Sequence, residues 1–565
     1  MRADQLPYSS LFSGSRATEV NLPFEKSVQL SLERAKAIVQ SYAFQIEDVL
    51  ETPSAALWNM HIDPIMLIDG GAATYASIQV NLTAGTLSEY LKGQPYLRKT
   101  IEDILAFRVL AHYCLTEVGH GLDAINMETV ALALPEGGFD LHTPSESAAK
   151  MMPPTSPIGM PSVAIVFAKL QGDKQNYGIR PFVVPLSDGS KLFHGIRTRV
   201  LPMRGGSAPV NHSLTYFNHV KLPQSALLGP MNSLPPGAEA ERQNFLAVIW
   251  RAATGALALG GMGISALERA AYIAGRYSQH RMIGSVANPS PIIQFRTQHT
   301  PVLVALAQAM VSKEFWKFSI RMFTDPSVEH RVKHAYAAVF KATVIHHSQT
   351  ANLELSERLG ARGLFQFSDI VSQYNVVRGI SIAEGDILGL CIRLVSELLL
   401  GRYSLLPSTN PSSLLARHES GVFSELKDLL KQADHHRGDT FNRFILPQCE
   451  RMVRAIGHRM AFDAAVSAGL DSRVTDLYLA SAMKQDAAWY ILGAHLTLTD
   501  QYIQEDRAIQ AALPYLNEWL EATDVGPYVQ NPVLSPQHWQ SFVEKLPVHE
   551  APRVRASVDF FPARL

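Results

Sequence analysis

The sequence has few cysteines, no basic run and a nearly balanced charge. Three widely spaced cysteines, Cys114, Cys391 and Cys449, form neither a disulfide framework nor a zinc-binding pattern within 565 residues. Lysines and arginines number 50 against 51 aspartates and glutamates, so the formal net charge of -1 gives no support for an extended nucleic-acid surface. We therefore expect an intracellular globular protein with no metal site and no nucleic-acid partner.

The chain also lacks the usual marks of export or membrane insertion. Its N-terminus has no apolar core followed by a small-residue cleavage site, so we expect no secretory signal. The most apolar stretch, residues 245–267, is interrupted by Arg251 and many small residues, which fits a buried helix better than a span of ~20 apolar residues. The last three residues, Ala563-Arg564-Leu565, resemble the Ser-Lys-Leu peroxisomal signal. Such a tripeptide gains weight only if the function points to the peroxisome; otherwise we expect a cytoplasmic protein.

The spacing of apolar residues divides the chain into helical and strand-rich parts. Helical spacing extends to about Phe107, and residues 130–228 then form short β-branched or aromatic runs separated by Gly, Pro, Asp and Asn. Helical spacing resumes after the proline-rich residues 229–241. We predict a mostly α fold with an inserted antiparallel β domain. The expected divisions are an N-terminal helical domain (1–107), a middle β domain (108–232), a helical bundle (240–405) and a C-terminal helical domain (406–565).

Residues 114–121, CLTEVGHG, place polar groups and two glycines after an apolar stretch. One interpretation is a helix end and a turn, in which Gly119 and Gly121 supply positive φ and the Thr116 hydroxyl acts as a cap. The other is a loop whose bare backbone lies close to a flat ligand. These eight residues alone do not distinguish the two.

Several further motifs occur with this one, from about residue 106 to residue 401. The segment HTPSESAAK is similar to [HN]-T-P-x-x-[ST]-[AS]-x-K, FNHVKLPQSALLG to F-D-x-x-R-I-P-R-x-x-L-[LM], and AEGDILGL to E-G-[DE]-N. Together with T-E-[LV]-G-H-G, these are motifs of the acyl-CoA oxidases in the acyl-CoA dehydrogenase superfamily, and they occur in the family order. The chain resembles that family, although its last region matches only in expected helicity.

The resemblance implies the acyl-CoA dehydrogenase/oxidase fold, with a helical N domain, a β-barrel-like middle domain, a helical bundle and an extra C-terminal helical domain. It implies an FAD-dependent oxidase that converts an acyl-CoA or related thioester to the trans-2-enoyl thioester and reduces O2 to H2O2. Family members are homodimers or tetramers with FAD near the subunit interface. We therefore expect a homodimer without a membrane span, located in the peroxisome.

Glu384 in the E-G-D segment is the expected catalytic base. The flanking residues are apolar, and an apolar pocket raises a carboxyl pKa toward neutrality, which suits removal of a weakly acidic α-proton. Alternatively, Glu384 caps the N-terminus of the next helix, where the helix dipole favours an acid; both roles can hold. The resemblance further implies substrate contacts from Glu117, Gly121 and Gly385.

Five residues are expected cofactor contacts by the same resemblance. Thr116 would contact the flavin through its hydroxyl and backbone N–H, and Thr155 would offer a replacement hydroxyl. Arg281 corresponds to a family arginine that reaches the FAD pyrophosphate from the partner subunit, and a guanidinium suits paired phosphate oxygens. A surface ion pair is the alternative for Arg281. Gln298 and Gly363 are weaker matches to other FAD-binding positions.

The chain departs from the family pattern where the flavin would lie. Residues 151–155, MMPPT, replace an aromatic and glycines, and prolines donate no N–H to a ligand. Leu122 and Ile387 replace polar residues of two other motifs. These changes imply an altered acyl pocket or a changed mode of holding FAD.

Three interpretations therefore stay open. The favoured one is an FAD-dependent acyl-CoA oxidase. The second is a dehydrogenase-like flavoenzyme that acts on an unusual substrate without producing peroxide. The third is a family member that has lost flavin and serves as a non-catalytic partner; retention of Glu384 and Thr116 argues against it.

Overall fold

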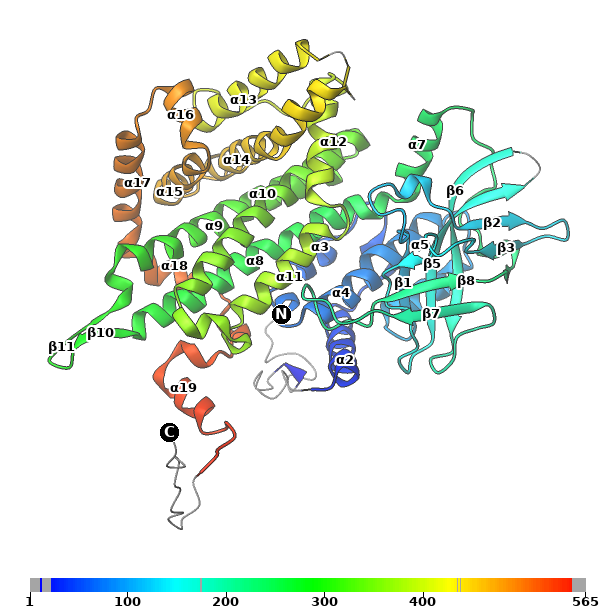
Figure 1. Ribbon diagram of the computed structural model, residues 1–565, viewed down its shortest axis with the longest axis horizontal. Helices are drawn as coiled ribbons and strands as arrows, with labels where there is room; N and C mark the ends of the chain where they lie inside the picture. The colour runs from blue at the N-terminus through cyan, green and yellow to red at the C-terminus, as the bar shows by residue number, and fades with distance from the viewer. Residues whose placement is uncertain (1–10, 13–21, 173–174, 434, 437, 551–565) are drawn as a thin grey trace, which may run out of the picture.

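The computed structural model has two lobes (Figure 1). Strands β1 to β9 gather in one lobe, while the long helices α8 (Trp250–His280), α9 (Arg296–Thr324) and α10 (His330–Glu357) lie side by side in the other, which also carries the small β10–β11 hairpin. This confirms the expected fold class, mostly helical with an inserted β domain. The structure describes residues 11–12, 22–172, 175–433, 435–436 and 438–550.

The N-terminal part is helical up to Leu105. Its elements are α2 (Phe24–Tyr42), η3 (Ile46–Val49), α3 (Ala55–Ile62), η4 (Pro64–Leu67), α4 (Gly70–Ser77), η5 (Ile78–Ala84), α5 (Gly85–Tyr90) and α6 (Leu97–Leu105). Ser54, Asp63 and Asp69 each cap the helix that follows by accepting a backbone N–H. Between α4 and α5, η5 is a π-helical segment, a widening of the helix that is frequent at functional sites.

The middle domain contains two sheets. The larger sheet has the order β1-β5-β2-β3-β9, with β6 paired to β5, and the smaller has the order β4-β8-β7. The strands are β1 (Leu110–Cys114), β2 (Val130–Ala133), β3 (Phe139–His142), β4 (Lys150–Met151), β5 (Ser162–Gly172), β6 (Gln175–Ser187), β7 (Ile196–Val200), β8 (Ser213–Phe217) and β9 (Val220–Leu222).

One feature of the sheet differs from the expectation. β5 and β6 form an antiparallel pair as predicted, but β1 and β2 both run parallel to β5, so the sheet is mixed rather than wholly antiparallel. Strand composition and turn residues predict where strands lie, but they do not reveal which way two distant strands pair. Residues along β5 are nearly all buried, which explains its continuous apolar run.

The remaining helices except α19 share one continuous core with the N-terminal helices, whereas the β domain has a smaller core of its own. α14 packs on α9, α10 and α12, so the C-terminal helices extend the bundle. These helices are α7 (Ala238–Val248), α11 (Ile370–Ile382), α12 (Ile387–Leu399), α13 (Leu414–Lys431), α14 (Cys449–Ser467), α15 (Ser472–Met483), α16 (Ala487–Ala494), α17 (Leu498–Ala512), α18 (Leu516–Ala522) and α19 (Pro536–Val543).

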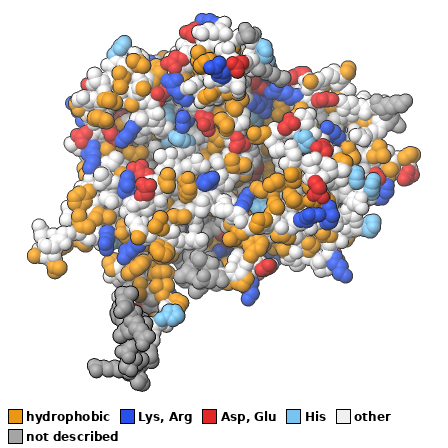
Figure 2. Space-filling model, viewed as in Figure 1, with side chains coloured by type: hydrophobic (Ala, Val, Ile, Leu, Met, Phe, Trp, Pro, Cys, Tyr) orange, Lys and Arg blue, Asp and Glu red, His pale blue; other side chains and the backbone are white. Residues whose placement is uncertain are grey.

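The apolar stretch around Arg251 forms the start of α8, most of which is buried. In the described part of the chain no single helix has the length and apolar character to cross a membrane, and only the bent pair α7 and α8 meets that test jointly. On the face shown in Figure 2, acidic and basic side chains are interspersed. The final tripeptide, Ala563-Arg564-Leu565, lies outside the described residues.

A buried ion pair holds β4, the first strand of the smaller sheet in chain order. Lys150 Nζ lies 2.9 Å from Glu117 Oε1, and both side chains are fully buried. Glu117 also accepts from the Thr129 hydroxyl at 2.6 Å and from the backbone N–H groups of Glu128 and Thr129. The carboxylate therefore fastens the loop after β1 to the start of β2 and to β4.

Replacing Lys150 with Met should destabilise the protein by about 3–5 kcal/mol, because it leaves the Glu117 carboxylate buried without its counter-ion. The matched control is Lys221→Met, which removes a 2.9 Å pair with Asp140 from a side chain that is 63% exposed. An exposed pair contributes only about 0–1 kcal/mol. Urea unfolding followed by circular dichroism measures both losses; equal losses would contradict the anchoring role of the buried pair.

Candidate active site

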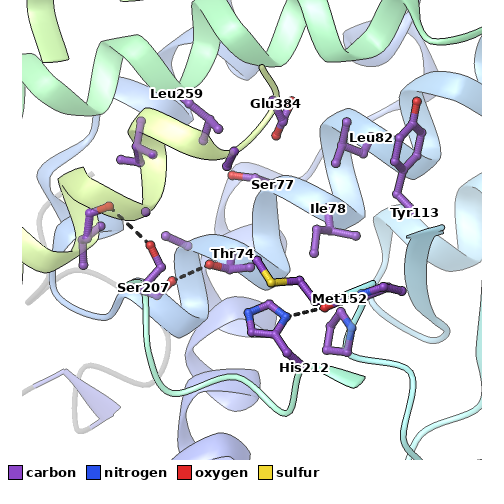
Figure 3. A pocket seen from close by; sticks show the side chains of 18 of the residues that line it. Thr74, Ser77, Ile78, Leu82, Tyr113, Met152, Ser207, His212, Leu259 and Glu384 are labelled. Carbon is purple, nitrogen blue, oxygen red and sulfur yellow. Dashed lines mark hydrogen bonds between the residues drawn. The ribbon is translucent and has the colours of Figure 1, made fainter. Parts of the chain in front are cut away.

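A cavity of ≈ 190 Å³ lies where the N-terminal helices, the β domain and the bundle meet. Figure 3 shows Glu384 on one side of it, with Met152 and His212 on the other. Among the described residues that line the cavity, Glu384 is the only acid. The lining residues are Gly70, Ala73, Thr74, Ser77, Ile78, Leu82, Tyr113, Met152, Pro153, Pro154, Arg204, Ser207, His212, Leu259, Met262, Val376, Gly379, Ile380, Ala383 and Glu384.

Glu384 stands in the turn between α11 and α12. Its φ of 52° is left-handed, a region that costs a residue with a Cβ about 1–2 kcal/mol, and Gly385 follows at φ 106°. Asp386 is the cap of α12, since its carboxylate accepts from Gly389 N at 3.0 Å. The capping role considered for Glu384 therefore belongs to Asp386, and the Glu384 carboxylate is left to line the cavity.

The Glu384 carboxylate packs against α8 at Gly255, a position that has no side chain. A Cβ built on Gly255 of α8 would lie 1.2 Å from Glu384 Oε2, so a larger residue there would displace the carboxylate. From the π-helical η5, Asn81 Nδ2 donates to the same oxygen at 2.9 Å and to Arg251 O at 3.2 Å. The position of the carboxylate is therefore fixed by the room left at Gly255 in α8 and by the hydrogen bond from Asn81 in η5.

Burial raises the pKa of Glu384 to about 8, against the opposing effects of Lys341, the Asn81 hydrogen bond and Arg251. A carboxyl with such a pKa is a much stronger base, once ionised, than an exposed one. Burial raises the pKa of Tyr113 well above its usual range, and the nearby Glu384 charge acts in the same direction. The arrangement is suited to accepting a proton from a carbon acid held in the cavity.

The segment around Thr116 is a loop that follows strand β1, so the helix-end interpretation is wrong. The Thr116 hydroxyl donates to Met151 O, and Met151 N donates back to Thr116 O at 3.0 Å. At the tip, Gly121 has open space around it, and the neighbouring Leu122 lies 3.4 Å from a Cβ built on Gly389 in α12. The loop thus runs from residues 151–152 toward the helix that follows Glu384.

Two expected contacts take structural roles instead. The Glu117 carboxylate is enclosed by Lys150 and by the backbone N–H groups of Glu128 and Thr129 just before β2, so it is not free for the expected contact with substrate. Thr155 is 1% exposed and its hydroxyl pairs with Thr215 at 2.6 Å, so it offers no surface for the expected flavin contact. Burial and internal hydrogen bonding, neither visible in a motif, account for both differences.

Polar atoms without protein partners belong to the cavity wall. Tyr113 Oη, Arg204 Nε and His212 Nε2 make no hydrogen bond with any described residue. Arg204 forms no ion pair within the described chain, and its nearest recorded partner is the Met152 sulfur at 3.8 Å. A flat ligand with carbonyl and ring-nitrogen atoms could pair with such side chains, whereas the wall residue Pro154 has no N–H to offer.

None of Arg281, Gln298 and Gly363 is among the residues that line this cavity. Arg281 is exposed at the end of α8, roughly 39 Å along the helix axis from Gly255. Gln298 lies at the start of α9, which follows the β10–β11 hairpin (Met282–Pro291), and its Oε1 is buried without a partner among the described residues. A Cβ on Gly363 would lie 1.9 Å from Ser356 O, so its own chain requires that glycine.

Sequence reasoning missed the residues that surround the base. Asn81, Gly255 and Lys341 belong to segments with no recognised motif, and each comes from a different element. Polar or charged residues inside apolar helical runs were the available signal: Arg251 and Lys341 both interrupt such runs, and both side chains are buried. The signal identifies buried polar groups but not the residue they serve.

Comparisons with known proteins agree with the motifs. Residues 258–399 match the family model "Acyl-CoA oxidase, C-alpha1 domain". A peroxisomal acyl-coenzyme A oxidase 1 of Arabidopsis thaliana is 26% identical over 44% of this chain and 39% of its own length. A putative peroxisomal acyl-coenzyme A oxidase 3.2 of the same plant is 22% identical over 68% of this chain and 58% of its own length. The chain thus spans about half the length of the curated relatives it matches.

The fold matches over nearly the whole chain. Acyl-CoA oxidase 1 of Yarrowia lipolytica superposes with a TM-score of 0.80 at 16% identity, covering 97% of this chain and 90% of that one. Acyl-CoA oxidase-2 of Caenorhabditis elegans, solved with FAD, ascaroside-CoA and ATP, gives 0.69 at 14% identity, covering 96% and 94%. In motifs, matched domain and fold, the chain is similar to the acyl-CoA oxidases.

Proposed function

We propose that this protein is an oxidoreductase of the acyl-CoA oxidase type, with Glu384 as the base that removes the α-proton of an acyl thioester. One observation carries the proposal: Glu384, whose pKa burial raises to about 8, is the one acid among the described residues that line the cavity between the three domains. It stands in the region that matches the acyl-CoA oxidase domain. The product would be the trans-2-enoyl thioester.

The cavity fits the ring of FAD through side chains rather than loop backbone. Tyr113, Arg204 and His212 carry polar atoms without a partner among the described residues, and Met152 and Pro153 supply an apolar wall. Bound FAD would accept the hydride that leaves the β-carbon and pass its electrons to O2, giving H2O2. Two solved relatives from Caenorhabditis elegans contain FAD, which supports the same cofactor here.

Three features of the chain itself would act on the substrate. The Glu384 carboxylate would take the α-proton, held in place by Asn81 and the gap at Gly255. The backbone N–H of Glu384 makes no recorded hydrogen bond in the described chain and would donate to the thioester oxygen, where negative charge develops. The apolar wall would exclude water, which strengthens both interactions.

Arg281 and Gly363 bear on the oligomeric state. Because Arg281 lies roughly 39 Å along α8 from Gly255, it cannot serve the cavity of its own chain. We infer a homodimer in which Arg281 of one subunit reaches the FAD phosphates bound by the other, as the family resemblance implies. Gly363 and Gln298 lie at the same end of the bundle and would border that partner site.

The peroxisome is the inferred location. Both plant relatives described above are named as peroxisomal, which supports this location. An enzyme that releases H2O2 also suits a compartment separated from the cytoplasm.

Glu384→Gln should retain bound FAD and lose flavin reduction by about 10²–10⁴-fold, because only the proton acceptor is removed. Anaerobic mixing with a medium-chain acyl-CoA, followed by flavin absorbance, measures the rate. Glu89→Gln is the matched control: burial raises the pKa of Glu89 to about 7, yet it does not line the cavity. Equal rates for Glu384→Gln and wild type would refute the assignment, and a wild type that takes up no FAD would favour a non-catalytic role.

The pH dependence should follow from the raised Glu384 pKa. The base acts when ionised, so kcat/KM should fall about tenfold per pH unit below a midpoint near 8 and level off above it. Thioester deuterated at the α-carbon should react more slowly, which identifies the proton-transfer step. A midpoint near 4.5, the ordinary carboxyl value, would contradict the proposed environment of the base.

Mixed dimers test the shared site. Pairing an Arg281→Ala chain with a Glu384→Gln chain creates one site with both native residues only if Arg281 serves the partner subunit. Such heterodimers, isolated by two affinity tags, should show about half the wild-type activity, whereas each homodimeric variant should be weak. Inactive heterodimers would place Arg281 outside the partner's site, and a monomeric protein would exclude the arrangement.

A further inference from the structure

The turn that carries Glu384 rests on a buried lysine. Lys341 is fully buried in α10, within an apolar helical run. Its Nζ donates to Ala383 O at 2.5 Å and to Gly385 O at 2.7 Å, the two carbonyls that flank Glu384 in the chain. Both side chains are described and no ion pair joins Lys341 to the Glu384 carboxylate, so the contact is made through the backbone.

This contact fixes the direction of a backbone donor. The C=O of Ala383 and the N–H of Glu384 belong to one planar trans peptide, in which the two groups point in opposite directions. Since the Ala383 carbonyl points at Lys341, the Glu384 N–H must point away from α10. The same N–H makes no recorded hydrogen bond within the described chain and remains available to a ligand.

The lysine also compensates for strain and charge in the turn. Glu384 has a positive φ of 52°, a conformation that a residue with a Cβ keeps only where surrounding contacts hold it, whereas Gly385 adopts positive φ without that cost. A buried ammonium near a buried carboxylate favours the charged form of each. The other charged groups that face this pair are Arg251 from α8 and Asp386 at the start of α12.

We propose that Lys341 is a positioning residue that aims both the Glu384 carboxylate and the Glu384 N–H at the substrate by fastening the two flanking carbonyls. The ammonium would keep the base ionised at lower pH than burial alone allows. It would also hold the N–H where the thioester oxygen develops charge. This inference rests on the proposed function for its catalytic meaning, but the contact with the turn is independent of any substrate.

Two substitutions separate the charge from the hydrogen bonds. Lys341→Met is close in volume and removes both; Lys341→Gln keeps a neutral amide donor, on a side chain one atom shorter, and removes the charge. Lys333→Met, on the same helix and away from the cavity lining, is the matched control. Infrared difference titration of each FAD-loaded protein without substrate, with Glu384→Gln subtracted, measures the ionisation midpoint of the Glu384 carboxyl.

Both Lys341 variants should raise that midpoint by about one pH unit or more, while the control leaves it unchanged. The rate of anaerobic flavin reduction should then fall about tenfold near neutral pH in Lys341→Gln and recover at alkaline pH. In Lys341→Met the alkaline rate should stay low, because the N–H is no longer aimed. If Met does not fold, the Gln variant decides.

Unchanged midpoints in both variants would overturn the role of the lysine, whatever the wild type catalyses. A wild type that reduces no flavin with any thioester would instead refute the proposed function, and the infrared midpoints would still decide whether Lys341 controls the carboxyl. Matching rate profiles for wild type and both variants would show that the turn holds itself.

Discussion

The site depends on one constraint: a carboxylate must be held in a nearly apolar junction without being neutralised by an ion pair. Glu384 meets this through a gap at Gly255, a neutral donor from Asn81, and a lysine that contacts only the neighbouring carbonyls. A direct ion pair would lower the carboxyl pKa and weaken the base, whereas complete isolation would leave it protonated. A neutral donor and charges that do not contact the carboxylate directly keep the pKa of Glu384 raised but still close to neutral pH.

That constraint explains why three domains meet at one turn. Asn81 comes from a π-helical segment. The wider turn of a π-helix gives a side chain another direction than a regular helix would, and here the Asn81 side chain points toward the bundle. Gly255 belongs to a helix whose other small residues let α10 approach closely, as at Gly260, and α10 carries Lys341. The base is therefore supported by the packing of long helices rather than by its own loop, and rigid elements hold a site more accurately than loops do.

Part of this was predictable from the sequence. Apolar spacing and turn residues predict the helices and the strands such as β5 and β6, and the E-G-D segment predicts Glu384 as a base. Sequence spacing could not identify the support, because Asn81 is 303 residues away from Glu384 in the chain and contacts it only after the domains pack. The family resemblance assigned Glu117 to substrate, because a motif shows residue type but not the burial and the Lys150 partner that determine the role of this side chain.

The altered segment at residues 151–155 follows the same physical logic. Prolines at 153 and 154 remove backbone donors from the cavity wall, yet Arg204 and His212 bring unpaired side-chain nitrogens to that wall. Backbone donors have a fixed direction, whereas side-chain donors can adjust. Replacing backbone donors with side-chain donors therefore still allows a ligand to bind, but it fixes the orientation of the ligand less strictly. Because Met151 exchanges hydrogen bonds with Thr116, this wall is joined directly to the loop that leads toward α12 and the base.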